Sequence, residues 1–169
     1  RWVKVEFLQY YDESGSLAFD AFLNGDFEVA AQTVARDVKE QNVYDVAREN
    51  GVSMVRVRVY RVPLSDYLSK FEYFAYIADE EMGEQVFTVN WESVEGLIRN
   101  TGVSDFLIFD DWGVVALLYN ESTGQVREAR LVSDPSEIRA YSALADKLID
   151  TGEPFKEGEF AAIVEGRMA

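Results

Sequence analysis

Residues 105–132 read DFLIFDDWGVVALLYNESTGQVREARLV, and this stretch decides the fold class. Two apolar runs lie on either side of the adjacent acids Asp110 and Asp111, and a third strand-like run follows the turn STG at residues 122–124. Asp and Gly tolerate the backbone angles of tight turns, and short apolar runs between turns are typical of strands. The stretch therefore predicts three antiparallel strands joined by short turns, that is, a meander.

Two further stretches extend the predicted sheet. VKVEF at residues 3–7 and VSMVRVRVY at residues 52–60 alternate apolar and polar side chains, which is typical of strands with one buried face. Apolar residues at helical spacing predict helices over residues 16–50 and 64–83. Asp134 as a cap and Pro135 at the first helical position predict the start of a last helix.

Length and composition favour one domain. With 169 residues, 48% of them hydrophobic, the chain can bury one core. We predict a single α+β domain over residues 1–152, in which an antiparallel sheet contains the meander at about residues 105–132 and helices pack on one face. Residues 153–169 are acidic and contain glycine, and we expect them to form a loosely attached C-terminal tail.

The residue types that are missing exclude several kinds of chemistry. The chain has no cysteine and no histidine, which excludes thiol nucleophiles, disulfides, histidine bases and tetrahedral zinc sites. A cytoplasmic location is then the default expectation. No run reaches the roughly 20 apolar residues that span a bilayer, so we expect no membrane insertion. Neither a dinucleotide fingerprint nor a P-loop is present, and no catalytic residues can be assigned.

The chain is strongly acidic. Its 31 acidic and 16 basic residues give a formal net charge of −15, which repels phosphate backbones and argues against direct nucleic-acid binding. A solubilising surface would explain this charge, and a protein partner with a basic surface would exploit it because complementary fields speed association. We expect the excess acids to be spread over the outside of the domain and not gathered around a reacting centre.

Five residues are candidates for ligand binding. Arg56 and Arg58 share one face of a strand about 7 Å apart and, with Arg61, form a basic stripe that could clamp a carboxylate or phosphate. The more common alternative is that they pair with acids on neighbouring strands. Asp66 and Tyr67, at the loop-to-helix corner PLSDY, could line a pocket, or Asp66 could simply favour the helix dipole.

Carboxylates also suggest a metal site. Adjacent acids at a tight turn can share a divalent cation, although the same residues suit the tip of a hairpin. A Mg²⁺-dependent enzyme for phosphoryl transfer or hydrolysis would use such ligands together with an arginine on the anion. The candidate Mg²⁺ ligands are Asp66, Glu72, Asp110 and Asp111. If the protein is not such an enzyme, we expect it to bind no cofactor.

Two motifs carry a family resemblance. PLSDY at residues 63–67 and DFLIFDD at residues 105–111 resemble motifs of an uncharacterised, mainly actinobacterial family classed as a domain of unknown function. The similarity extends over roughly residues 3–148, with Arg61 and Val62 replacing the Ser–Glu usually found before the proline. Members of that family are often encoded near helix-turn-helix regulators. The resemblance implies a regulatory or accessory role and supplies no catalytic residues.

Together these observations favour a non-enzymatic accessory or regulatory protein that acts through protein–protein contact. A DNA-binding helix-turn-helix regulator is the partner that the resemblance implies. The Mg²⁺-dependent carboxylate enzyme and a small-ligand sensor with its pocket at the PLSDY corner stay open as alternatives. The sequence also leaves open whether the protein forms a homodimer.

Overall fold

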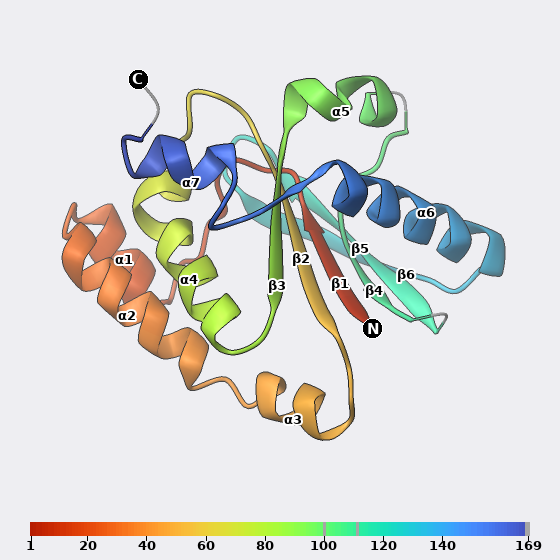
Figure 1. Cartoon of the computed structure of the whole chain (residues 1–169), viewed down its shortest axis with the longest axis horizontal. Helices are drawn as coiled ribbons and strands as arrows, with labels where there is room; N and C mark the ends of the chain where they lie inside the picture. Colours follow the sequence, from red (N-terminus) through yellow and green to blue (C-terminus); the bar gives the residue numbers. More distant parts are fainter. Residues whose placement is uncertain (100, 111, 168–169) are drawn as a thin grey trace.

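A computed structural model describes residues 1–99, 101–110 and 112–167. In these residues seven strands form one mixed sheet with the order β6-β5-β4-β1-β2-β3-β7 (Figure 1). The strands are β1 (Trp2–Glu6), β2 (Met54–Tyr60), β3 (Gln85–Asn90), β4 (Asp105–Phe109), β5 (Gly113–Asn120), β6 (Gln125–Val132) and β7 (Glu153–Pro154). The helices are α1 (Leu17–Leu23), α2 (Phe27–Lys39), α3 (Val43–Glu49), a π-helical turn η1 (Leu68–Glu72), α4 (Tyr73–Glu81), α5 (Trp91–Ile98), α6 (Pro135–Thr151) and α7 (Glu159–Val164).

The α+β class and the meander are confirmed. β4, β5 and β6 are joined in sequence and pair antiparallel, and β4 also pairs antiparallel with β1. At the turn between β4 and β5, Asp110 has φ 48°, a left-handed conformation that acids adopt in tight turns. The sheet is mixed because helical connections return β2 and β3 parallel to β1.

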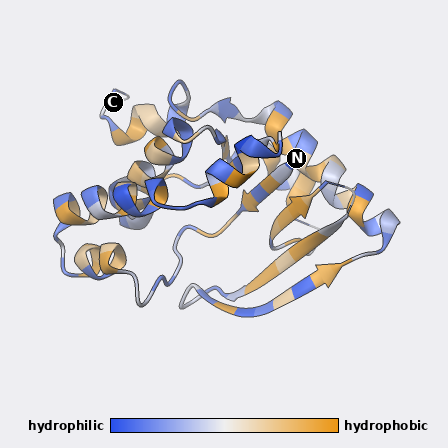
Figure 2. Ribbon diagram, turned by 90° about the horizontal axis from the view of Figure 1, so that it is seen from below, coloured by the Kyte–Doolittle hydropathy of each residue, from blue (hydrophilic) through white to orange (hydrophobic). Residues whose placement is uncertain are grey.

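Helices cover both faces of the sheet, and not one face as the sequence predicts. Val55, Val57 and Val59 of β2 belong to a core with α5 and α6. On the other face, Met54 and Tyr60 belong to a second core with α1, α2, α4 and α7. Figure 2 shows how apolar residues follow the strands between these two layers. The polar side of a strand can be mistaken for a solvent face when it is in fact covered by a helix.

The segment after Gly152 is not a loosely attached tail. β7 pairs with β3, and the helix α7 follows it. Phe155 and Phe160 are fully buried and pack against Tyr76. Although this segment is acidic, it also contains aromatic residues that complete the core under α4. The domain therefore continues past residue 152.

Helix starts and one irregular turn place the side chains of the site. Asp134 accepts hydrogen bonds from the backbone N–H groups of Ser136 and Glu137 at 2.9 and 3.0 Å, which confirms the predicted start of α6. The helix after PLSDY contains the π-helical turn η1, where an extra residue per turn shifts the buried face. Glu72, at the end of η1, is therefore turned toward the sheet and buried.

Candidate functional site

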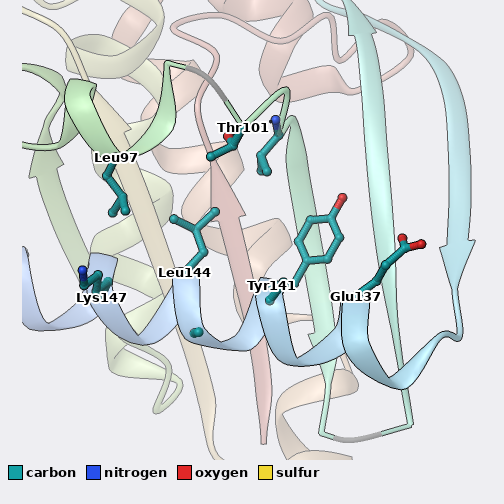
Figure 3. Close-up of a pocket in the computed structure, with 9 residues that line it drawn as sticks. Leu97, Thr101, Glu137, Tyr141, Leu144 and Lys147 are labelled. Atoms are coloured by element: carbon teal, nitrogen blue, oxygen red, sulfur yellow. Dashed lines mark hydrogen bonds between the residues drawn. The ribbon is translucent and has the colours of Figure 1, made fainter.

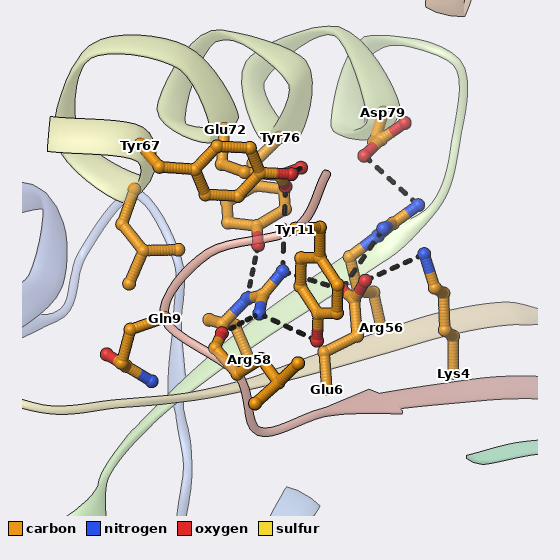
Figure 4. Close-up of polar contacts among 12 residues, drawn as sticks. Lys4, Glu6, Gln9, Tyr11, Arg56, Arg58, Tyr67, Glu72, Tyr76 and Asp79 are labelled. Atoms are coloured by element: carbon orange, nitrogen blue, oxygen red, sulfur yellow. Dashed lines mark hydrogen bonds and ion pairs between the residues drawn. The ribbon is translucent and has the colours of Figure 1, made fainter. Parts of the chain in front are cut away.

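Charged side chains occupy the sheet face that is covered by α4. Arg58 on β2 is 0% exposed and Glu6 on β1 is 3% exposed. The two residues lie opposite each other in the parallel pairing of β1 and β2, with Arg58 Nη2 3.2 Å from Glu6 Oε2. Figure 4 shows them under Glu72 and Tyr76. Buried charges are costly unless they are paired, so this arrangement must be held by its partners.

Arg58 is held on all sides. Its Nε donates a hydrogen bond to the Tyr76 hydroxyl at 2.5 Å, and its Nη1 donates to the Leu8 carbonyl at 2.7 Å. Nη1 also donates to the Tyr11 hydroxyl at 3.3 Å, and Nη2 lies 3.7 Å from Glu72 Oε2. Burial alone would lower the pKa of Arg58, but Glu6 and its other neighbours raise it well above the ordinary value. Nη2 has no hydrogen-bond partner in the described residues, but the guanidinium is fully buried and therefore serves as a fixed anchor that a ligand does not reach.

Arg56 contacts Glu6 as well and adds two more carboxylates, Asp79 and Glu84. Its guanidinium lies 3.2 Å from Glu6, 3.4 Å from Asp79 and 3.3 Å from Glu84. Burial raises the pKa of Asp79 and of Glu84, and the charge of Arg56 only partly offsets it. For Glu6, burial is outweighed by Arg58, Lys4 and Arg56, which hold the pKa of this carboxyl well below its usual range. Glu6 is thus the ionised centre of the network.

A tyrosine hydroxyl lies between two carboxyl groups at the edge of the network. Tyr67 donates a hydrogen bond to Glu72 at 2.6 Å, and the same hydroxyl contacts Glu13. One hydroxyl has one proton, so it can donate to only one of the two carboxylates. Burial and the nearby charge of Glu72 raise the pKa of Glu13 to about 7. When Glu13 is protonated, its proton satisfies the second contact.

A second tyrosine–carboxyl pair closes the network from β4. The Tyr11 hydroxyl donates to Asp105, which also accepts a hydrogen bond from the backbone N–H of Phe7 at 2.9 Å. Burial raises the pKa of Asp105 to about 6, although the hydrogen bond from Tyr11 opposes this shift. Asp105 therefore fixes Tyr11 over Arg58, whose guanidinium carbon lies 5.1 Å from the centre of the Tyr11 ring.

Part of this network lines a cavity of about 460 Å³ beside α2 and α4. Its charged and phenolic lining consists of Lys4, Glu6, Tyr11, Asp12, Glu13, Asp37, Tyr44, Arg56, Tyr67, Glu72, Asp79 and Tyr119. The expectation that the excess acids are spread over the outside of the domain and not gathered inward does not hold for the acids of this cavity, although no three described acids are grouped as metal ligands. Six carboxylates of the lining face a concavity: Glu6 is on β1, and the other five come from the loop after β1, from α2, from η1 and from α4.

A family model described as a domain of unknown function, DUF6879, matches residues 1–159. The chain belongs to this DUF6879 family. The match includes β7 and reaches the first residue of α7, in agreement with a domain that continues past residue 152. No curated protein and no solved structure matches the chain. No helix in the described part of this DUF6879 domain is long and apolar enough to cross a membrane.

The DUF6879 domain brings together three of the five candidate ligand-binding residues. Arg56 and Tyr67 line the cavity, and Arg58 lies directly beneath it, paired with acids as the common alternative predicts. Arg61 points elsewhere, with its guanidinium carbon 4.0 Å from the centre of the Trp91 ring. Asp66 is exposed and forms an ion pair with Lys70 at 3.0 Å.

The candidate Mg²⁺ ligands do not converge in the residues that the structure describes. Asp110 contacts the amino group of Arg1 beside the start of β1, whereas Glu72 lies at the other end of this strand. Asp66 is on the surface, and Asp111 lies outside the described residues. Within residues 1–99, 101–110 and 112–167, no three acids are grouped as metal ligands. Asp66, Glu72 and Asp110, the three candidates that the structure describes, therefore do not form a metal centre together.

Sequence reasoning missed most of the network. The residues it missed are Glu6, Tyr11, Glu13, Tyr44, Tyr76, Asp79, Glu84 and Asp105. A signal for one of them exists in the sequence, because the alternation of β1 places Lys4 and Glu6 on one face and the parallel pairing sets them beside Arg56 and Arg58. The others come from loops and helices whose position relative to β1 no local pattern fixes.

A second cavity of about 510 Å³ lies between α5 and α6 (Figure 3). Leu97, Tyr141 and Leu144 are among the residues that line it, and Figure 3 shows these side chains directed into it. Its one lining carboxylate, Glu137, forms an ion pair with Arg130 at 3.7 Å. This cavity is mainly apolar, so the cavity beside α2 and α4 is the better candidate for recognition of a polar ligand.

Proposed function

We propose that this DUF6879 domain binds a small polar molecule in the cavity beside α2 and α4 and acts as a non-enzymatic, ligand-responsive regulatory or accessory protein. The observation that carries the proposal is a concave site in which buried charges are fixed by other buried charges. Ligand sites are typically concave and hold a few fixed polar groups. In the described residues, Glu72 Oε2 and Arg56 Nε are buried without a hydrogen-bond partner, which is unusual unless another molecule supplies one.

A thermal-melting screen tests the proposal. Small polar compounds of positive, negative and zero charge are added to the protein, and a compound that binds raises the melting midpoint because it stabilises the folded state. Tyr67→Phe removes the hydroxyl between Glu13 and Glu72 and should weaken binding about tenfold. Tyr73→Phe is the matched control, since the Tyr73 hydroxyl donates to Glu165 outside the cavity. A screen without any midpoint shift, or shifts that Tyr67→Phe leaves unchanged, contradicts the proposal.

Protein–protein contact is the second candidate function, and an exposed apolar groove favours it. Val43 and Val46 of α3 and Trp112 of the β4–β5 turn line a groove of about 420 Å³, and Trp112 is 74% exposed. Exposed apolar patches mark interaction sites. The net charge of −15 favours a partner with a basic surface. We propose a helix-turn-helix regulator in the cytoplasm as this partner.

This second proposal predicts a complex that forms at low salt and weakens at high salt. Size-exclusion chromatography of the chain mixed with a helix-turn-helix regulator measures the complex directly. Trp112→Ser should abolish the complex, whereas Leu17→Ser should not, although Leu17 is also 74% exposed. If no complex elutes at low salt, protein contact with this regulator is ruled out.

A further inference from the structure

We infer that the ligand of the cavity carries a positively charged amine, which binds between Glu13 and Glu72 against the tyrosine rings. This inference rests on the proposed function and names the chemical class of its ligand. Four features of the cavity carry it: the balance of charges, the hydroxyl shared by two carboxyl groups, an unpartnered carboxylate oxygen and the aromatic wall.

The charges of the lining are unbalanced. Six carboxylates line the cavity against two cations, Lys4 and Arg56. Both cations are already engaged, since Lys4 Nζ lies 2.7 Å from Glu6 and Arg56 contacts three carboxylates. Among the described residues, no cationic nitrogen pairs with Glu13. Carboxylates outnumber cations in the lining, and both cations are paired, although Arg56 Nε has no hydrogen-bond partner in the described residues. The cavity therefore suits a cation better than an anion.

The shared hydroxyl marks where the cation binds. Tyr67 has one proton for two carboxyl groups, Glu13 and Glu72, so the trio lacks one hydrogen-bond donor when both carboxyls are ionised. Glu72 is 8% exposed, and its Oε2 has no hydrogen-bond partner in the described residues, with Arg58 Nη2 3.7 Å away. An ammonium group has three N–H donors. It would supply the donor that the carboxyl groups of Glu13 and Glu72 lack.

The walls favour an organic cation over a metal ion. Tyr11, Tyr67 and Tyr119 lie together, with ring centres 6.1 Å apart for Tyr11–Tyr67 and 5.0 Å apart for Tyr11–Tyr119. Aromatic faces attract ammonium groups, and aromatic carbon accommodates the attached alkyl chain. Hard divalent cations instead require several oxygen ligands around one point, and the acids of the described residues are not grouped in that way.

Three four-carbon probes of equal length test the inference. Putrescine carries two ammonium groups, 1,4-butanediol is neutral and succinate carries two carboxylates. We expect putrescine to raise the melting midpoint and to give a saturable heat in isothermal titration calorimetry, and the other two to do neither. Glu13→Gln should weaken putrescine binding about tenfold, since it removes a charge-assisted hydrogen bond. Glu157→Gln, an exposed acid outside the cavity, should leave it unchanged.

The outcomes separate this inference from the function on which it rests. Equal loss of putrescine affinity in Glu13→Gln and Glu157→Gln would mean general attraction to an acidic surface and would overturn the inference. Succinate, butanediol or another anionic or neutral compound could bind in a Tyr67-dependent manner while putrescine does not. This result would overturn the inference that the ligand is an amine, but it would support the cavity as a ligand site. If compounds of every charge class fail, the proposed function fails as well. Circular dichroism of each variant establishes that it is folded.

Discussion

Replacing Arg58 by methionine is expected to lower the free energy of unfolding by about 3–5 kcal/mol, because removing one partner of a buried ion pair leaves its counter-charge unpaired. Methionine fills much of the arginine's volume, so the loss comes mainly from charge and not from a cavity. Glu6 is 3% exposed and would keep only Lys4 and Arg56 as cationic neighbours. The Leu8 carbonyl and the Tyr76 hydroxyl would also lose a hydrogen bond. Urea denaturation followed by circular dichroism at pH 7 measures the change.

Arg61→Met is the matched control for Arg58→Met. Arg61 is exposed and lies over the ring of Trp91, so its loss should cost no more than about 1 kcal/mol. A double variant with Glu6→Gln removes both buried charges and should recover part of the loss, because neutral groups are cheaper to bury than an unpaired ion. If Arg58→Met lowers the free energy of unfolding by less than about 1 kcal/mol, the network is hydrated and its ion pairs contribute little to stability.

The predictable parts of the fold are those that short sequence patterns encode. The meander follows from the turn residues between three strand-like runs, and the start of α6 follows from the cap at Asp134. The pairing of Arg56 and Arg58 with acids follows from their shared strand face in an acidic chain. In each case, residues within a few positions of one another determine the result.

The unpredicted parts depend on which elements pack together. The alternation of β1 says that Lys4 and Glu6 share a face, but it cannot say that α4 covers that face. Helical spacing assumes a regular turn, whereas η1 inserts a residue and brings Glu72 inward. Composition is a poor guide after Gly152, where acids surround Phe155 and Phe160 and these two rings decide the packing. The site is built from such long-range contacts, which is why the sequence reveals only its arginines, Tyr67 and Glu72, the last in a different role.

The proton on Glu13 should be visible as a pH dependence of stability. Burial and the charge of Glu72 raise the pKa of Glu13 from 4.5 to about 7. Between these values the unfolded chain loses this proton while the folded protein keeps it, so the free energy of unfolding falls as the pH rises. The slope for this one group is at most about 1.4 kcal/mol per pH unit, or up to about 3 kcal/mol over the whole range. The contribution is fully present below about pH 4.5 and lost above about pH 7.

Glu13→Gln isolates this contribution, because the amide does not titrate. Relative to the unchanged protein, the variant should gain up to about 3 kcal/mol of stability between pH 4 and pH 7.5, measured by urea denaturation at half-unit steps. The free energy of unfolding of Glu157→Gln should follow the same pH dependence as that of the unchanged protein, since Glu157 is exposed. A constant difference between Glu13→Gln and the unchanged protein would show that Glu13 is ionised in the folded state. With saturating putrescine the slope should flatten as well, because a bound ammonium replaces the proton as the positive charge between Glu13 and Glu72.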